Sequence, residues 1–144
     1  IKSSEQNILE ALKVSDIVVG AVYVVGKEAP RVVLREMINE MKPGTVMVDI
    51  SIDQGGCFET SKTTTHDDPT YLINGVVHYC VANMPGSVPL TATEALNEAT
   101  LPFVIDIANK GLDNSLSEDI NLFNGLNLKN NEIVHKSVRE SFNL

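Results

Sequence analysis

An aspartate, a glutamine and two glycines follow directly on an apolar run, and these residue types can bind a small molecule and handle its protons. The run covers residues 45–52, and Asp53, Gln54, Gly55 and Gly56 come immediately after it. A carboxylate can accept hydrogen bonds or act as a base, and an amide side chain both donates and accepts. Glycine allows the backbone to approach a ligand closely. The pattern predicts a ligand-binding corner at the end of a strand.

A second apolar run, residues 76–82, also ends in a polar, glycine-bearing turn, Asn83-Met-Pro-Gly86. Ligands of open parallel sheets bind outside the carboxyl ends of the strands, so we expect one cleft built from both corners. Plainer interpretations remain open, because Asp53 could cap the next turn and Asn83 could be an ordinary turn residue. The paired glycines after Asp53 favour a functional role, since a simple cap requires neither.

The elements that must position these residues can be predicted from the pattern of apolar side chains. We expect a helix over residues 4–13 with a capping box near its start, and a strand over 16–20 that is buried on both faces. A second helix is expected from Pro30 to Met41, followed by the strand over 45–52. This alternation predicts a parallel sheet with right-handed crossovers.

The second half of the chain has a different character. Residues 57–75 are polar and predict a surface loop that ends in a turn at Asn74-Gly75. The composition changes near Pro89, and Thr91 to Glu94 resembles a capping box for a long helix that ends at Gly111. Pro102 is expected to kink that helix. A small hairpin across residues 126–134 and a short final helix follow.

Other chemistry-bearing residues fit structural roles better than catalytic ones. His78 and Cys80 share one side of a strand and are expected to pack in the core, because a metal site would need further ligands. The His66-Asp67-Asp68 run could suggest a metal or a general base, but it is more typical of a solvated turn. His135 is expected on the surface of a helix. We therefore predict no metal site.

Composition narrows the class of protein. The chain has 144 residues and a formal net charge of −8 with a pI of about 4.7, and its basic residues form no cluster. Nucleic acid and anionic membranes are therefore not expected partners. No run approaches the roughly 18 apolar residues of a membrane span, and no secretory leader is recognised. No GxGxxG or P-loop motif is present, so a phosphate-cradling loop is not expected here.

Two further features concern cell compartment and completeness. Cys57 and Cys80 lack CxxC spacing and are expected to be reduced thiols of a cytoplasmic protein. The first residue is Ile1, and a helix signal follows at once. We expect the chain to be part of a longer protein.

Three segments of the chain, residues 16–30, 41–61 and 77–104, resemble bacterial alanine dehydrogenases. The similarity is dense and in register over roughly residues 10–111, whereas residues 112–144 are compatible but less distinctive. A related transhydrogenase subunit and the saccharopine-dehydrogenase-like enzymes share the fold. The strings DQGGCFE and HYCVANMP are more similar to alanine dehydrogenase.

The resemblance implies an α/β fold: the second half of a Rossmann-type parallel sheet, followed by a helical C-terminal segment. Residues 1–89 would form part of an NAD-binding domain, and residues 90–144 the returning segment of a discontinuous catalytic domain. The glycine-rich first turn, the ribose-binding acid and the family's substrate-binding and catalytic basic residues would lie in a preceding, N-terminal half.

The resemblance also implies residue roles. Asp53 matches the catalytic aspartate that handles protons beside the nicotinamide. Tyr23 stands where a leucine is expected in the family. The residues that match cofactor-contacting positions are Val22, Tyr23, Ile50, Ser51, Ile52, Asp53, Val81, Ala82, Asn83 and Met84.

The implied activity is the reversible, NAD-dependent oxidative deamination of L-alanine to pyruvate and ammonia. The implied partners are L-alanine or pyruvate, NAD(H), the N-terminal half and further copies of the subunit, since the family forms homohexamers. This chain alone is expected to bind NAD weakly and to be inactive. Two alternatives remain: a non-catalytic assembly module, and an NAD-binding subunit related to proton-translocating transhydrogenase.

Overall fold

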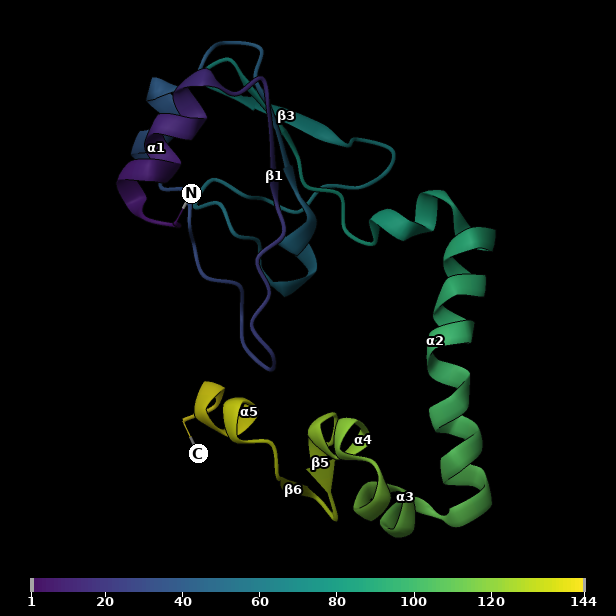
Figure 1. Ribbon diagram of the computed structural model, residues 1–144. Coiled ribbons are helices and arrows are strands. Elements are labelled where there is room, and N and C mark those ends of the chain that lie inside the picture. Colours follow the sequence, from purple (N-terminus) through teal and green to yellow (C-terminus); the bar gives the residue numbers. More distant parts are fainter. Residues whose placement is uncertain (1, 144) are drawn as a thin grey trace. The chain divides into compact units, whose positions relative to one another are not determined.

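A computed structural model describes residues 2–143 of the chain, which divide into two compact units, Ile1–Met84 and Pro85–Leu144. Figure 1 shows the sheet and its neighbouring elements in the first unit, and the helices of the second. The division falls where η3, a short 3₁₀ helix over Met84–Ser87, follows the last strand of the sheet. The predicted domain boundary after residue 89 stays a prediction.

The first unit is built on a four-stranded, mostly parallel sheet. Its strands are β1 (Ile17–Gly20), β2 (Val46–Asp49), β3 (Thr70–Ile73) and β4 (Val76–Tyr79), in the spatial order β1-β2-β4-β3. The pairs β1–β2 and β2–β4 are parallel, and β3 runs antiparallel to β4. The predicted α/β class with a parallel sheet is confirmed.

Helix α1 (Glu5–Val14) precedes β1 and confirms the first predicted helix. The Ser4 hydroxyl caps it by accepting a hydrogen bond from the Asn7 backbone N–H at 3.3 Å. Leu12 on its inner face is 3% exposed and belongs to the core. The helix therefore contributes one apolar stripe to the sheet unit.

The predicted helix over residues 30–41 is wrong, because only a short 3₁₀ helix, η1 (Arg35–Glu40), forms there. The backbone before it is extended: the Val32 N–H donates to the carbonyl of Cys57 at 2.8 Å, and Val33 makes a parallel bridge with Phe58. Those pairings require extended dihedral angles and delay the first helical turn. The apolar residues that suggested a helix are nevertheless buried in the core.

The strand predicted over residues 45–52 is shorter than expected. β2 ends at Asp49, and residues Ile50–Gln54 form a 3₁₀ helix, η2, that Gly55 terminates with φ of +91°. The Gly55 and Gly56 N–H groups donate to the carbonyls of Ile52 and Ser51 at 3.0 and 2.9 Å. These bonds close a turn and direct the chain away from the sheet.

The segment over residues 57–75 is not simply a surface loop, because β3 lies within it. Asn74 and Gly75 both have positive φ, 51° and 80°, which suits a two-residue hairpin and pairs β3 with β4. The ring of Tyr71 stacks on His78 with centroids 5.0 Å apart. Cys57 and Phe58, at the start of the segment, are fully buried.

The two faces of the sheet differ in exposure. One face packs against α1, η1 and residues 57–58, whereas Ile17 and Val19 of β1 point to the other and are 67% and 57% exposed. The prediction that β1 is buried on both faces is therefore wrong, because no element of the described first unit covers that side. The core consists of Leu12, Ala29, Val33, Met37, Ile38, Met41, Met47, Cys57, Phe58 and Val76.

The second unit begins with a long helix, α2 (Pro89–Lys110), which contains Pro102 and ends at Gly111 with φ of +79°. The expected capping box at Thr91 is wrong: the helix starts two residues earlier, at Pro89, whose fixed φ suits a first turn. None of its described side chains is buried. Within residues 2–143, no helix combines the length and apolarity that crossing a bilayer requires.

Short elements complete the second unit. Helices α3 (Leu112–Glu118) and α4 (Ile120–Asn124) were not predicted. The small hairpin is confirmed, since β5 (Leu128–Lys129) pairs antiparallel with β6 (Glu132–Ile133) across two asparagines of positive φ. The last helix, α5 (Lys136–Ser141), is also confirmed.

Candidate functional site

The ends of β2 and β4, which lie side by side in the sheet, bring two of the predicted site residues together. The Asn83 backbone N–H donates a hydrogen bond to Asp53 Oδ1 at 3.3 Å. Both residues are exposed, and Asn83 has a left-handed φ of 53°. The carboxylate therefore faces solvent at the corner after β4, where a ligand can reach it.

The end of β1 is connected to the same edge. The Ser51 hydroxyl donates to the carbonyl of Val22 at 2.8 Å, which ties the loop after β1 to η2. Tyr23 and Ile50 are 66% and 51% exposed, so two apolar side chains stand uncovered near this edge. The loops after three parallel strands thus carry the residues predicted to bind a ligand.

The predicted site residues are not equally accessible. Ser51, Ile52 and Val81 are 2%, 5% and 0% exposed, so in this chain their side chains pack inward. Ala82 and Met84 are partly buried. A ligand at this edge would meet the backbone of the buried positions and the side chains of the exposed ones.

A residue that sequence reasoning missed, Asp49, is the buried anion of the site. Its carboxylate is fully buried at the end of β2. It accepts hydrogen bonds from the backbone N–H groups of Cys57 at 2.8 Å and Phe58 at 3.4 Å, and from the Ser61 hydroxyl. Strand alternation offered a signal, because Asp49 lies two residues after Met47 and so shares its core-facing side.

Two basic side chains also lie near the corners: Arg31, which sequence reasoning missed, and His66, which was expected in a solvated turn. Nη1 of Arg31 donates to the carbonyls of Gly55, Gly56 and Phe58. Nε2 of His66 lies 3.2 Å from the carbonyl oxygen of Asn83, to which it can donate. His66 therefore belongs to the Asn83 corner rather than only to a solvated turn.

The loop that carries His66 is itself fixed to the chain after β4. The Thr64 N–H donates to the carbonyl of Cys80 at 2.9 Å, and the Ala82 N–H donates to the carbonyl of Thr64 at 3.2 Å. This short parallel pairing continues the sheet pattern past the end of β4. It holds the second corner in place.

The cysteines and the buried histidine have structural environments. Burial and the nearby Asp49 charge raise the pKa of Cys57 to about 11, so its thiol stays protonated. Burial lowers the pKa of His78, whose Nδ1 lies 3.2 Å from the carbonyl of Val76 and whose Nε2 lies 2.8 Å from the Thr60 hydroxyl. A carbonyl only accepts, so Nδ1 carries the proton and Nε2 accepts from Thr60.

Core packing of His78 and Cys80 is therefore confirmed, and both cysteines are free. Across residues 2–143, the acidic, histidine and cysteine side chains form no cluster of three or more that could hold a metal ion. The polar groups that the described chain brings to the candidate site are the Asp53 carboxylate, the His66 imidazole and backbone N–H and carbonyl groups.

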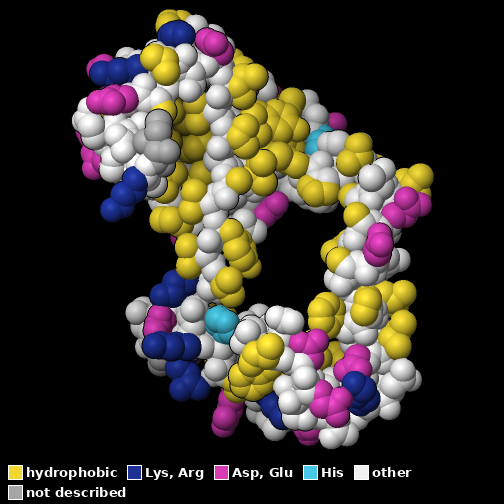
Figure 2. All heavy atoms as spheres, in the orientation of Figure 1, with side chains coloured by type: hydrophobic (Ala, Val, Ile, Leu, Met, Phe, Trp, Pro, Cys, Tyr) yellow, Lys and Arg dark blue, Asp and Glu magenta, His cyan; other side chains and the backbone are white. Residues whose placement is uncertain are grey.

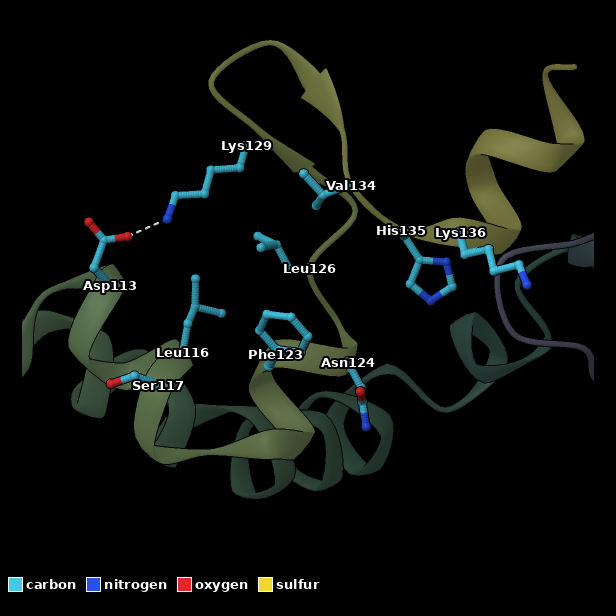
Figure 3. Close-up of a pocket in the computed structure, with 10 residues that line it drawn as sticks. All are labelled: Asp113, Leu116, Ser117, Phe123, Asn124, Leu126, Lys129, Val134, His135 and Lys136. Carbon is cyan, nitrogen blue, oxygen red and sulfur yellow. Dashed lines mark hydrogen bonds and ion pairs between the residues drawn. The ribbon is translucent and has the colours of Figure 1, made fainter. Parts of the chain in front are cut away.

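A cavity of about 650 Å³ lies in the second unit, and none of the predicted site residues lines it (Figure 3). Its one carboxylate, Asp113, is paired with Lys129. His135 lies just before α5, and not on a helix surface as expected; its Nδ1 has no partner within the described residues. The apolar part of the lining comes from Leu116, Phe123, Leu126 and Val134. Its lining residues are Asp113, Leu116, Ser117, Phe123, Asn124, Leu126, Lys129, Val134, His135 and Lys136.

Comparison with protein families gives a match over residues 1–136 to the family model "Alanine dehydrogenase/PNT, C-terminal domain". The chain is 51% identical to an alanine dehydrogenase of Halomonas elongata and 53% identical to one of Staphylococcus haemolyticus, covering 99% and 100% of this chain. It spans only 38% and 39% of those relatives' lengths.

Two solved structures are also similar to this chain. An L-alanine dehydrogenase structure matches 98% of this chain and 39% of its own, with a TM-score of 0.78 and 46% sequence identity. A transhydrogenase from Sinorhizobium meliloti matches 93% of this chain and 36% of its own, with a TM-score of 0.68 and 23% identity, and so shares the fold.

Proposed function

Because the chain belongs to the alanine dehydrogenase/PNT C-terminal domain family, we propose that it forms the C-terminal part of an NAD-dependent alanine dehydrogenase. The relatives are more than twice its length, so the remainder of the active site would lie in an N-terminal portion. The complete enzyme would consist of this chain joined to such an N-terminal portion, its own or that of the Halomonas elongata relative.

The proposed reaction converts L-alanine, NAD⁺ and water to pyruvate, ammonium, NADH and a proton. NAD⁺, when bound, accepts the hydride from the substrate carbon. The part left to this chain is to hold the nicotinamide half of the cofactor and to manage protons. The exposed Tyr23 and Ile50 side chains and the backbone at residues 50–52 and 81–84 would contact the cofactor.

The residues present fit such a ligand. Three parallel strand ends meet at one edge, which is where dinucleotides bind in open α/β sheets. Gly55 and Gly56, both with positive φ, leave the turn after η2 without side chains. Uncovered apolar groups stand beside an exposed carboxylate, as a nicotinamide and a small charged substrate would require.

The observation that carries the proposal is the contact between Asp53 Oδ1 and the Asn83 N–H. It places the carboxylate at the corner where the chains leaving β2 and β4 come together, rather than in the interior. From there Asp53 would take up and release protons as the substrate passes between amine, imine and carbonyl forms. Asn83 would fix the direction in which the carboxylate points.

Further proposals concern organisation. Residues 1–89 would be part of the NAD-binding domain, and residues 90–144 the returning segment of the catalytic domain. The enzyme would be cytoplasmic and homo-oligomeric, a hexamer as in its family.

Absorbance of NADH in the presence of L-alanine tests the proposed activity. The complete enzyme should form NADH only when L-alanine and NAD⁺ are both present. Hydride transfer between nucleotides without alanine would instead indicate a transhydrogenase-like subunit. A folded complete protein with neither activity would overturn the proposal and favour an assembly module.

A further inference from the structure

The turn that follows the candidate catalytic residue is held by two charged side chains, one through its backbone N–H groups and the other through its carbonyls. The buried Asp49 carboxylate accepts from the backbone N–H groups of Cys57 and Phe58. The Arg31 guanidinium donates to the carbonyls of Gly55, Gly56 and Phe58. Amide hydrogens and carbonyl oxygens of the Gly55–Phe58 turn thus both have charged partners.

The geometry around Gly56 shows how closely these groups approach the turn. A Cβ atom built on Gly56 would lie 2.8 Å from Asp49 Oδ2 and 3.0 Å from Arg31 Nη1. A side chain at this residue would therefore meet both charged groups and also the Cβ of Ser61 at 2.8 Å, and it would displace one of them. Only glycine allows both contacts, and its φ of +84° also favours glycine.

Burying a carboxylate costs free energy that an apolar residue at the end of β2 would avoid. Asp49 is fully buried, and its hydrogen bonds from nitrogen and oxygen donors come from Cys57, Phe58 and Ser61. Charge-assisted bonds of this kind are short and directional. Their common effect is to fix residues 57–61 against the end of β2.

We propose that Asp49 and Arg31 are positioning residues that hold Asp53 against the Asn83 corner by fixing the Gly55–Phe58 turn. Asp53 lies between Asp49 and this turn in the sequence, within the five-residue 3₁₀ helix η2. When both ends of η2 are fixed, the Asp53 carboxylate keeps its place beside the Asn83 N–H. This inference rests on the proposed catalytic function of Asp53.

The consequence for catalysis follows from how steeply reaction rates depend on geometry. A displacement of about 1 Å in a reacting group can cost about 100-fold in rate. Without the Arg31 hydrogen bonds, the carbonyls of Gly55 and Gly56 would be hydrogen-bonded only by water, and η2 could shift. We expect turnover to fall more than the affinity for NAD, because proton transfer depends steeply on the position of one carboxylate, whereas the proposed cofactor contacts are spread over residues 22–23, 50–52 and 81–84.

Steady-state kinetics of Arg31 variants in the complete enzyme test this. Arg31→Met removes the donors and should lower kcat about tenfold or more, with the KM for NAD changed less than about threefold. Arg31→Lys keeps a donor and should recover part of the loss. Arg35→Met is the matched control: it removes an exposed guanidinium that has no hydrogen bond or ion pair in the described chain, and should leave kcat unchanged.

Amide hydrogen exchange gives a readout independent of activity. The amides of Cys57 and Phe58 should exchange at least about tenfold faster in Arg31→Met and in Asp49→Asn than in the unchanged protein. Asp49→Asn keeps the shape of the side chain but removes its charge. Faster exchange with reduced kcat supports the proposal.

Wild-type kcat in Arg31→Met, or equal losses in Arg31→Met and Arg35→Met, would overturn the proposal. If an Arg31 variant fails to fold, Asp49→Asn and Arg31→Lys carry the same test. If the unchanged complete enzyme shows no alanine-dependent NADH formation, the proposed function fails by itself. Exchange at Cys57 and Phe58 then still decides whether the two charged residues fix the turn.

Discussion

Replacing Gly56 with alanine is a sharp test of how the site loop is built. The substitution places a Cβ in a left-handed conformation, which costs about 1–2 kcal/mol. It also places that atom 2.8 Å from Asp49 Oδ2, a buried group that cannot easily move. Overpacking of this kind costs about 1–3 kcal/mol. The sum predicts a loss of about 2–5 kcal/mol in the free energy of unfolding of the first unit.

Two other glycines provide matched controls. Gly44 has φ of +90° and nothing within 4 Å of the added atom, and Gly55 has φ of +91° with its nearest neighbour, Glu28 Oε2, at 3.7 Å. Alanine at either position should cost only the conformational term, about 1–2 kcal/mol. The excess loss in Gly56→Ala, about 1–3 kcal/mol, measures the close packing of Asp49, Arg31 and Ser61 around the turn.

Urea unfolding followed by tyrosine fluorescence measures these differences. The chain has three tyrosines and no tryptophan, and the tyrosines, Tyr23, Tyr71 and Tyr79, all lie in the first unit. The signal therefore reports that unit alone. If Gly56→Ala lost no more stability than Gly44→Ala at unchanged m-value, the close approach of Asp49 and Arg31 to the turn would be refuted.

Two further outcomes are expected. Isothermal titration of NAD into this chain alone should show only weak binding, because the proposed N-terminal part of the site is missing; micromolar affinity would contradict that division of the site. Burial lowers the pKa of His78, so the folded protein favours its neutral form. The His78 contribution to stability should be complete above the unfolded-state pKa of about 6.5 and decline as pH falls below it. Urea unfolding at about pH 7.5 and about pH 5 measures the decline, and His78→Gln, with no group to titrate, should show a smaller one; equal declines would contradict the assignment.

The sheet could be predicted because three of its strands are short apolar runs that end in polar turns. The exposure of one side of β1 could not be predicted, because Ile17 and Val19 are β-branched apolar residues of the kind found in buried strands. Whether such a face is covered depends on other elements of a protein, which a local pattern does not contain. Figure 2 shows hydrophobic side chains gathered on the surface of the sheet unit.

The crossover before β2 shows a different limit. Four apolar residues of the predicted helix, Val33, Met37, Ile38 and Met41, are buried in the core, but they do not reach it on a helix over residues 30–41. The extended pairing of Val33 with Phe58 joins residues 25 positions apart, and no local propensity encodes it. Hydrogen bonds to residues 57–58 therefore keep the start of this segment extended, although its apolar residues have helical spacing.

The candidate site was partly predictable for a related reason. Asp53 and Asn83 stand at the ends of apolar runs, and parallel strands bring such ends together. Asp49 and Arg31 were missed because their importance lies in contacts with the backbone of a turn that folds back on them. Such contacts can be identified only when the backbone conformation of the turn is known.

The most direct test of the account is the turnover of Asp53→Asn in the complete enzyme, with NADH affinity measured in parallel. A proton-transferring carboxylate contributes about 100-fold or more to rate, so kcat should fall at least that far while NADH still binds. The asparagine keeps the size of the side chain and can still accept from the Asn83 N–H. Turnover at the unchanged rate would show that the carboxylate at the β2–β4 corner does not perform the chemistry.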